Sequence, residues 1–258
     1  MIFRFILVLL LTLSSLFAEW KIDSEIEAGL FLPNLDGSIS NVHGSSDFTQ
    51  DYLYDRASAS YFGVDLFIGY DYAPNFSFDY FNMQDNSDAT LDKNVTVADG
   101  VFNSKVTTLS DFSVLNSVIY QDFKQKGKVF SLLGQKLYTG DIEFDVGLNI
   151  KYLTWNFEIR DQIDTTRPSS WIHVNELVPL PYIGCKYYLY GFIVHAEGSA
   201  LSFVEAKAMN YQVALSYRVI EGLSLSGAYL YEHFEAVEKN DTVKFTASGY
   251  KASFLYAF

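Results

Sequence analysis

Apolar and polar residues alternate along several long stretches of the chain. From Ile142 to Tyr152 every even-numbered position is apolar, whereas the odd-numbered positions are charged, amide or glycine residues. Side chains of a β-strand point alternately to the two faces of the sheet, so this pattern predicts a strand with one apolar and one polar face. Met209–Val219 and Trp20–Leu30 follow the same pattern. The chain is therefore predicted to be all-β.

The alternating stretches are long enough to cross a lipid bilayer. They persist for about ten residues, the length of a tilted membrane strand, whereas soluble strands average about 5–6 residues. We therefore expect a transmembrane antiparallel up-and-down β-barrel of ten strands, or of eight if Phe76–Met83 and Phe192–Phe203 are not strands. The ten expected strands are Trp20–Leu32, Ala59–Tyr72, Phe76–Met83, Leu109–Gln121, Asp141–Phe157, Val174–Leu189, Phe192–Phe203, Ala208–Val219, Leu223–Ala236 and Val243–Phe258.

The connections between these strands alternate between short and long. The short ones are 73–75, 190–191 and 220–222, and the long ones are 33–58, 84–108 and 159–173. Outer-membrane barrels have short periplasmic turns and longer outer loops, so both chain ends are expected on the periplasmic side. The lysine-rich segment 122–140 is long and yet falls on that side. We interpret it as a periplasmic excursion, for which a short helix is one form.

The N-terminal segment has the layout of a secretory signal peptide. Arg4 precedes an apolar run from Phe5 to Leu13, and small or polar residues lead to Ala18, after which cleavage is expected. The predicted organisation is a signal peptide over residues 1–18 and a single β-barrel over residues 19–258. The mature chain is expected to be exported to the cell outer membrane.

Composition supports a membrane barrel and removes other classes. The chain is 49% hydrophobic and 17% aromatic, yet its mean hydropathy is only +0.08, so its apolar residues are dispersed. The formal net charge of −13 argues against a nucleic-acid partner. Cys185 is the only cysteine, which leaves no intramolecular disulfide, and we expect it to be a small buried side chain.

Four short patterns resemble a family of small, largely uncharacterised outer-membrane β-barrel proteins of Gram-negative bacteria. They are Ala28-Gly29-Leu30-Phe31-Leu32-Pro33, Tyr72-Ala73-Pro74-Asn75-Phe76, Asp145-Val146-Gly147-Leu148-Asn149-Ile150-Lys151-Tyr152 and the aromatic terminal strand Gly249–Phe258. The resemblance implies a ten-stranded barrel that is inserted by the barrel-assembly machinery through its C-terminal strand. It implies no catalytic, cofactor-binding or metal-binding residue. The expected partners are outer-membrane lipid and lipopolysaccharide, and the expected state is a monomer.

The polar faces of the expected strands carry charges of both signs that would point into the barrel. These residues are Lys21, Asp23, Glu25, Glu27, Asp65, Asp79, Glu143, Asp145, Lys151, Glu197, Arg218 and Lys251. A ring of charges can line a narrow, ion-selective pore. However, a barrel of about eight strands is filled by its own side chains, and mixed charges suit ion pairing. We favour a filled interior with a structural or surface-interaction role, and a narrow solute route stays open.

Two alternative classes follow from the remaining residues. His43, His173, His195 and His233 each lie near serine or acidic residues, which keeps an outer-membrane protease or lipase with a site at the outer rim as an alternative. No protease or lipase signature surrounds them, and we predict no enzymatic activity. The acidic loop residues Asp47, Asp51, Asp55, Asp85, Asp88, Asp92 and Asp99 lack a calcium-loop pattern and are predicted to be solvated. A soluble periplasmic barrel with its aromatic rows turned inward is the second alternative.

Overall fold

The computed structural model describes residues 22–41, 44–47, 58–70, 72–97, 100–132, 135–202, 206–238 and 241–258. The predicted signal peptide 1–18 and the residues Lys21, His43, Asp51, Asp55 and Asp99 lie outside the described residues. Among the described residues, no helix is long and apolar enough to cross a membrane.

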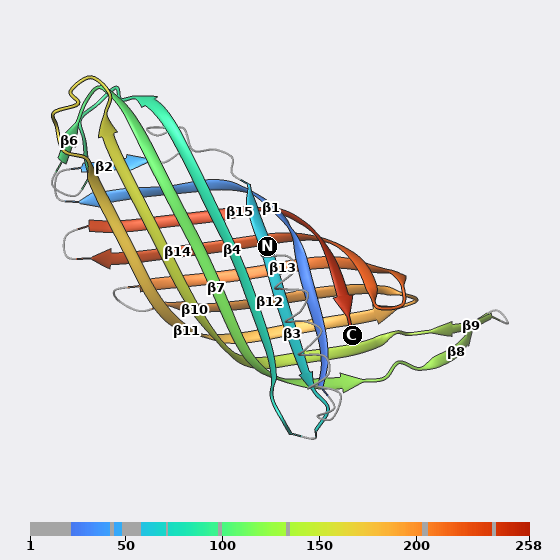
Figure 1. Cartoon of the computed structure of the whole chain (residues 1–258). Coiled ribbons are helices and arrows are strands. Elements are labelled where there is room, and N and C mark those ends of the chain that lie inside the picture. Colours follow the sequence, from blue (N-terminus) through green and yellow to red (C-terminus); the bar gives the residue numbers. More distant parts are fainter. Residues whose placement is uncertain are drawn as a thin grey trace.

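Ten long strands form one closed antiparallel barrel (Figure 1). Each strand pairs with its neighbour in the chain, and β15 closes the barrel against β1, from Glu25 opposite Ala257 to Ser40 opposite Thr242. This confirms the predicted up-and-down topology and the strand number. The barrel strands are β1 (Ile22–Asn41), β3 (Ala59–Ile68), β4 (Asn75–Thr90), β7 (Lys105–Gln125), β10 (Asp141–Asp161), β11 (Ser170–Leu189), β12 (Phe192–Ser202), β13 (Ala206–Ile220), β14 (Leu223–Glu238) and β15 (Asp241–Ala257).

The described residues also include five short strands, of which only β2 joins the barrel sheet. β2 (Gly44–Asp47) pairs with the end of β1, and β5 (Val95–Val97) pairs with β6 (Gly100–Phe102). β8 (Val129–Leu132) and β9 (Gln135–Tyr138) form a hairpin within the lysine-rich segment, so the expected helix is wrong there. Figure 1 shows this hairpin projecting away from the barrel.

Several strands extend further than the sequence predicted. β1 ends at Asn41 and not at Leu32, and β4 ends at Thr90 and not at Met83. The segments 33–58 and 84–108 are therefore only partly loop. The extensions of β1 and β4 lie at the end of the barrel that is remote from Ile22 and Phe258. We call this part the distal half, and the part with Ile22, Phe258 and the short turns the terminal half.

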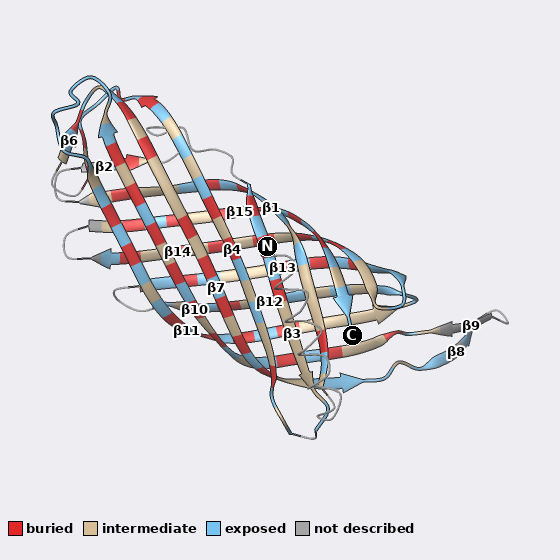
Figure 2. Ribbon diagram, viewed as in Figure 1, coloured by how far each residue is buried: buried red, intermediate tan, exposed pale blue. Residues whose placement is uncertain are grey.

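Apolar side chains face outward in the terminal half and inward in the distal half. This reversal is the reason why the sequence did not predict the strand extensions. In the terminal half of β10, Phe144, Val146 and Leu148 are exposed while Glu143 and Asp145 are buried. In its distal half, Trp155, Phe157 and Ile159 are buried, whereas Asn156 and Arg160 are exposed. Figure 2 shows the resulting alternation of buried and exposed positions along the strands. If the outward-facing row of a strand is assumed to be apolar over its whole length, the strand is predicted to end where that row becomes polar.

The exposed apolar side chains of the terminal half surround the barrel as a band that we call the apolar belt. On β10 the belt runs from Ile142 to Tyr152, which matches the 9–11 residues of a membrane-spanning strand. The aromatic residues of the belt, such as Phe62, Phe144 and Phe254, thus face outward, contrary to the soluble-barrel alternative. Tyr188 points inward from β11 and donates a hydrogen bond to Glu143 at 3.1 Å. The belt includes Leu30, Phe62, Phe78, Leu115, Ile119, Phe144, Val146, Leu148, Leu177, Ile183, Val194, Val213, Leu215, Leu225 and Phe254.

An apolar core fills the interior of the distal half. Aromatic rings from both sides of the barrel meet there: Phe245 on β15 lies 3.9 Å from Phe112 on β7 and 6.0 Å from Trp155 on β10, between ring centroids. The core continues through Phe81, Leu153, Phe157, Ile159, Val174, Leu180, Leu230, Phe234 and Val243. Because these side chains pack against one another across the barrel, the distal half has the layout of two sheets packed face to face.

The sheet is divided along two seams in the distal half. Among the described residues, the last pair between β11 and β12 is Tyr182 with Ser199, and the last pair between β1 and β3 is Phe31 with Ala59. Beyond these points β4, β7, β10 and β11 form one layer, and the strands from β12 to β15 with β1 and β2 form the other. Figure 1 shows the two groups of strands diverging in direction.

Proline residues account for the seam beside β11. The two-residue turn 190–191 has positive φ at both positions, 47° and 85°, a type I′ geometry in which the flanking residues Leu189 and Phe192 are hydrogen-bonded to each other. The odd-numbered residues of β11 therefore direct their backbone groups towards β12. Pro179 and Pro181 lie on this edge and lack the N–H that a ladder needs. Pairing with β12 consequently ends just before them.

A proline also lies at the seam beside β1. Ser24 and Phe258 exchange two backbone hydrogen bonds, at 3.2 and 3.0 Å, so the even-numbered residues of β1 face β15 and the odd-numbered ones face β3. Pro33 is odd-numbered and follows Phe31, the last residue of β1 that pairs with β3. The same missing donor therefore marks both seams.

Candidate functional site

The interior of the terminal half is polar and largely ion-paired. Lys251 lies 2.9 Å from Glu27, Lys186 lies 3.3 Å from Glu143, and a buried ion pair joins Lys151 to Glu232. The inward orientation that was predicted for the charged row is therefore confirmed for its described members. Cations of the interior also contact aromatic rings: the Lys251 ammonium lies 3.7 Å from the centroid of the Tyr61 ring.

A small cavity of about 320 Å³ remains between these groups. Its acidic wall is formed by Glu25 and Asp65, which face each other across β1 and β3, and by Asp79, which accepts a hydrogen bond from Tyr61. Its opposite wall carries Lys186 from β11. The apolar core lies on the distal side of this cavity, so side chains fill the barrel axis there.

The described histidines occupy three separate places. His195 lies in the polar interior, with its Nε2 3.4 Å from Glu197, and Tyr182 donates a hydrogen bond of 2.8 Å to the same carboxylate. His173 contacts Asn156 on the outer surface, and the Nδ1 atom of His233 lies 2.9 Å from the Thr246 hydroxyl. These contacts join no serine hydroxyl to a histidine.

The acidic loop residues and the cysteine lie apart from one another in the described part of the chain. Among the residues that the structure describes, no three His, Cys, Asp or Glu side chains are grouped to hold a metal ion. Asp88 accepts a hydrogen bond from Thr107 at 2.7 Å. Cys185 is half-buried on the outward-facing side of β11, opposite Phe144, and not buried in the interior as expected. Its odd position in β11 places it on the face that carries the apolar belt.

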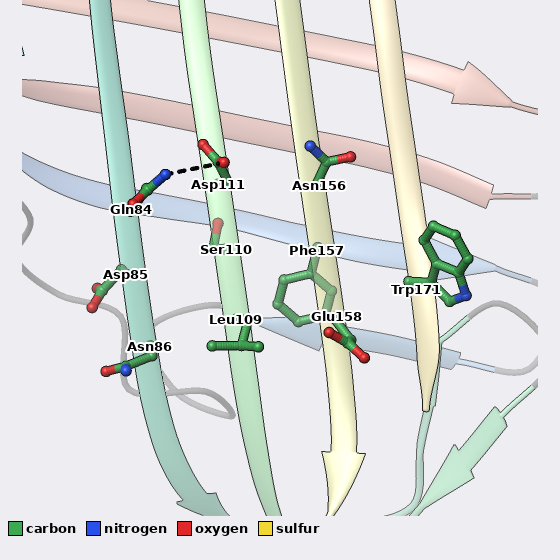
Figure 3. A pocket seen from close by; sticks show the side chains of 10 residues that line it. All are labelled: Gln84, Asp85, Asn86, Leu109, Ser110, Asp111, Asn156, Phe157, Glu158 and Trp171. Carbon is green, nitrogen blue, oxygen red and sulfur yellow. Dashed lines mark hydrogen bonds between the residues drawn. The ribbon is translucent and has the colours of Figure 1, made fainter. Parts of the chain in front are cut away.

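The outer surface of the distal half carries a groove of about 520 Å³ (Figure 3). It crosses four neighbouring strands, with Gln84 on β4, Asp111 on β7, Asn156 on β10 and Trp171 on β11. Leu109 and Trp171 supply apolar surface, and the Trp171 side chain is 69% exposed. The groove thus combines an open aromatic face with amide and carboxylate groups.

Hydrogen bonds fix the polar side chains of this groove. Asp111 accepts bonds from Asn82 at 2.7 Å and from Gln84 at 3.2 Å. The Arg160 guanidinium donates two bonds to Glu158, at 2.9 and 2.8 Å, and these bonds hold the pKa of that carboxyl below its usual range. Both carboxylates are therefore held as fixed acceptors. The sequence analysis missed this groove because it placed most of the lining residues in loops or at strand ends.

The fold and its surface define the class of the protein. A closed antiparallel barrel with a polar interior and an apolar belt of membrane-spanning height is a small β-barrel of the kind found in the outer membrane of Gram-negative bacteria. No protein-family model matches the sequence, and no curated protein matches it.

Solved structures of outer-membrane barrels are similar to this chain at low identity. The attachment invasion locus protein Ail of Yersinia pestis is 5% identical over 92% of this chain and 99% of its own, with a TM-score of 0.40. The outer membrane protease OmpT from Escherichia coli is 10% identical over 91% and 97%, with a TM-score of 0.41. Neisserial surface protein A is 11% identical over 92% and 97%, with a TM-score of 0.34. These values assign no activity to this chain, whose class follows from its own barrel and belt.

Proposed function

We propose that the protein is a non-conducting, non-enzymatic outer-membrane barrel with a surface-interaction role. The observation that carries this proposal is the apolar core of the distal half, in which Phe112, Trp155 and Phe245 pack across the barrel axis. A packed apolar core excludes water and hydrated ions. The strands that enclose it extend beyond the apolar belt as a rigid two-layer head, which suits display at the cell surface.

A conductance measurement tests whether the interior is closed. Purified protein is inserted into planar bilayers, and co-flotation with vesicles verifies insertion. We expect no stepwise current under conditions in which a porin control conducts. Discrete current steps from inserted protein would overturn the closed barrel, and they would point to the narrow solute route instead.

The groove in Figure 3 favours one class of ligand for the surface-interaction role. An exposed indole face beside fixed amide and carboxylate acceptors suits a polyhydroxylated ligand, because the ring covers the apolar face of a sugar and the acceptors receive its hydroxyls. The groove lies just beyond the belt, at the level of the saccharides of the outer leaflet. We therefore assign the saccharide portion of lipopolysaccharide as its ligand.

Calorimetric titration of the micelle-bound protein with the core oligosaccharide released from lipopolysaccharide tests this ligand. Trp171→Ala and Gln84→Ala are expected to weaken binding by about tenfold or more, the equivalent of about 1.4 kcal/mol. Asn34→Ala is the matched control, because Asn34 is an exposed polar residue of the opposite layer. Unchanged binding by the Trp171 variant would remove the groove from the proposal.

A further inference from the structure

The cavity in the polar interior has the size of a small ligand pocket. Its volume of about 320 Å³ corresponds to roughly ten water molecules. Two of its lining residues, Asp23 and Arg218, are exposed at the terminal end of the barrel. Towards the other end, the apolar core around Phe112 and Phe245 fills the barrel axis. A molecule can therefore enter the cavity from the terminal end but cannot pass through the barrel.

The lining of this cavity carries more negative than positive charge. Among the described residues, seven carboxylates line it against three lysine or arginine side chains. The Lys186 ammonium is shared between Glu143 at 3.3 Å and Asp145 at 3.4 Å. The Lys124 ammonium lies 3.3 Å from the same Glu143, and Arg218 lies at the mouth. The cations of the lining are thus too few to pair with all of its carboxylates.

The excess negative charge is concentrated on the wall formed by β1, β3 and β4. Glu25 and Asp65 are directly opposite each other on the inner face, where side chains lie about 5 Å apart and like charges repel. Asp79 lies on the next strand of the same wall. Lys251 pairs with the neighbouring Glu27 at 2.9 Å. In the described part of the chain, no Lys, Arg or His nitrogen lies within 4 Å of the other three carboxylates.

A buried tyrosine on β7 gives a second, independent indication of an occupant. Tyr120 lines the cavity and is 3% exposed, yet its hydroxyl makes no hydrogen bond to another described residue. Its ring and that of Phe67 each lie 5.5 Å from the Lys186 ammonium, so these aromatic walls already accommodate one cation. Because buried hydroxyls normally have partners, the Tyr120 oxygen is available to accept a hydrogen bond from a bound molecule.

We propose that this cavity binds an aliphatic polyamine, which enters from the terminal end of the barrel. Its ammonium groups lie beside Glu25, Asp65 and Asp79. One ammonium N–H donates a hydrogen bond to the Tyr120 oxygen, and the methylene chain packs against the aromatic rings. The cavity is larger than a single ion, and its described carboxylates are not grouped in the threes that a metal ion needs.

This site is separate from the groove in Figure 3, which we call the saccharide groove. The saccharide groove lies on the outer surface of the distal half, whereas the cavity lies inside the terminal half. Polyamine binding therefore goes beyond the surface-interaction role and does not depend on it.

Calorimetric titration of the protein in uncharged micelles tests the site with spermidine as the probe. The titration is run in about 0.15 M salt, at which charges more than about 8 Å apart are largely screened. We expect saturable binding of one spermidine per chain and no binding of octanediol, a linear molecule of similar length without charge. Failure to observe saturable spermidine binding would overturn the proposal. Displacement of spermidine by an equal concentration of Mg²⁺ would also overturn it, since binding would then be a general counter-ion effect.

Variants that remove one charge locate the bound spermidine. Asp65→Asn and Glu25→Gln keep the shape of the side chain and are each expected to weaken binding by about tenfold or more. Asp88→Asn is the matched control, because it removes the same charge from the exposed surface of the distal half, and it should change the affinity less than about twofold. A heat-modifiable band on gels verifies that each variant is folded. Equal weakening by Asp65→Asn and Asp88→Asn would contradict the site, since binding would then follow net charge alone.

A further variant tests the unpaired hydroxyl. Tyr120→Phe removes only this group and keeps the ring, and it is expected to weaken spermidine binding by about threefold or more. Tyr217→Phe is the control, because Tyr217 is an exposed tyrosine on the outer face of β13, and it should leave the affinity unchanged. Equal affinities of the two variants would contradict the contact between the ligand and Tyr120.

Discussion

The two halves of the barrel are built from the same ten strands but point their apolar and polar side chains in opposite directions. In the terminal half apolar side chains face outward and charges face inward, whereas in the distal half the apolar side chains form the core and polar ones face outward. On β10 the change takes place within a few residues, between Tyr152 and Asn156. The difference shows that the alternation of a β-strand specifies only which residues share a face. The apolar face points outward where the strand is surrounded by lipid and inward where it is surrounded by water.

The largest expected effect is the loss of the distal core. Trp155 is 1% exposed, and its indole N–H donates a bond of 2.9 Å to Ser110. Trp155→Ala removes this packing and is expected to lower the free energy of unfolding by about 3–5 kcal/mol. Urea titration in micelles measures the change. Trp171→Ala, on the exposed surface of the same layer, is the control and should cost less than about 0.5 kcal/mol.

Breaking an interior ion pair tests the other half. Glu232→Ala leaves the Lys151 ammonium buried without its partner, which is expected to cost about 3 kcal/mol or more in the same titration. The paired replacement Lys151→Met with Glu232→Leu removes both charges and should cost much less than the single change. If both variants were equally destabilised, shape and not charge would hold this part of the interior together.

A charge placed on the outer face compares the halves directly. Val146 and Asn156 both face outward from β10, one in the belt and one beyond it. Val146→Arg is expected to cost about 2–4 kcal/mol, because the guanidinium would enter hydrocarbon, whereas Asn156→Arg should stay within about 0.5 kcal/mol. Unfolding in lipid vesicles measures both. Equal costs would contradict the placement of the belt in the membrane.

The smallest effect concerns the seam. Replacing Pro179 and Pro181 by Thr restores two N–H donors on the edge that faces β12. We expect the β11–β12 ladder to lengthen towards Ser202, with a gain of no more than about 1 kcal/mol. Hydrogen exchange of the β12 amides measures this extension as slower exchange. Unaltered exchange would show that packing of the two layers, and not the missing donors, keeps the seam open.

The sequence was sufficient to predict the barrel but not its division into halves. All ten strands and the inward direction of Glu143, Asp145 and Lys151 follow from period-two alternation, which depends on local sequence alone. The distal extensions were missed because the apolar row changes face near Tyr152, and a row that turns polar looks like the end of a strand.

The seams and the saccharide groove could not be predicted from local sequence patterns, for a different reason. Pro179 is visible in the sequence, but its effect depends on which neighbouring strand its backbone faces, and this is set by the distant turn 190–191. The saccharide groove joins residues of four strands that are far apart in the chain, such as Gln84 and Trp171. Such assemblies follow only from the register of the whole sheet.

The reversal of polarity also determines how deep the molecule sits. A shift of two residues along the strands, roughly 7 Å, would drag Asn156 and its neighbours into hydrocarbon or lift Tyr152 and its neighbours towards water. Either displacement is unfavourable, so the barrel has a single resting height. The loops and the groove of the distal half are thereby held at a fixed distance from the lipid.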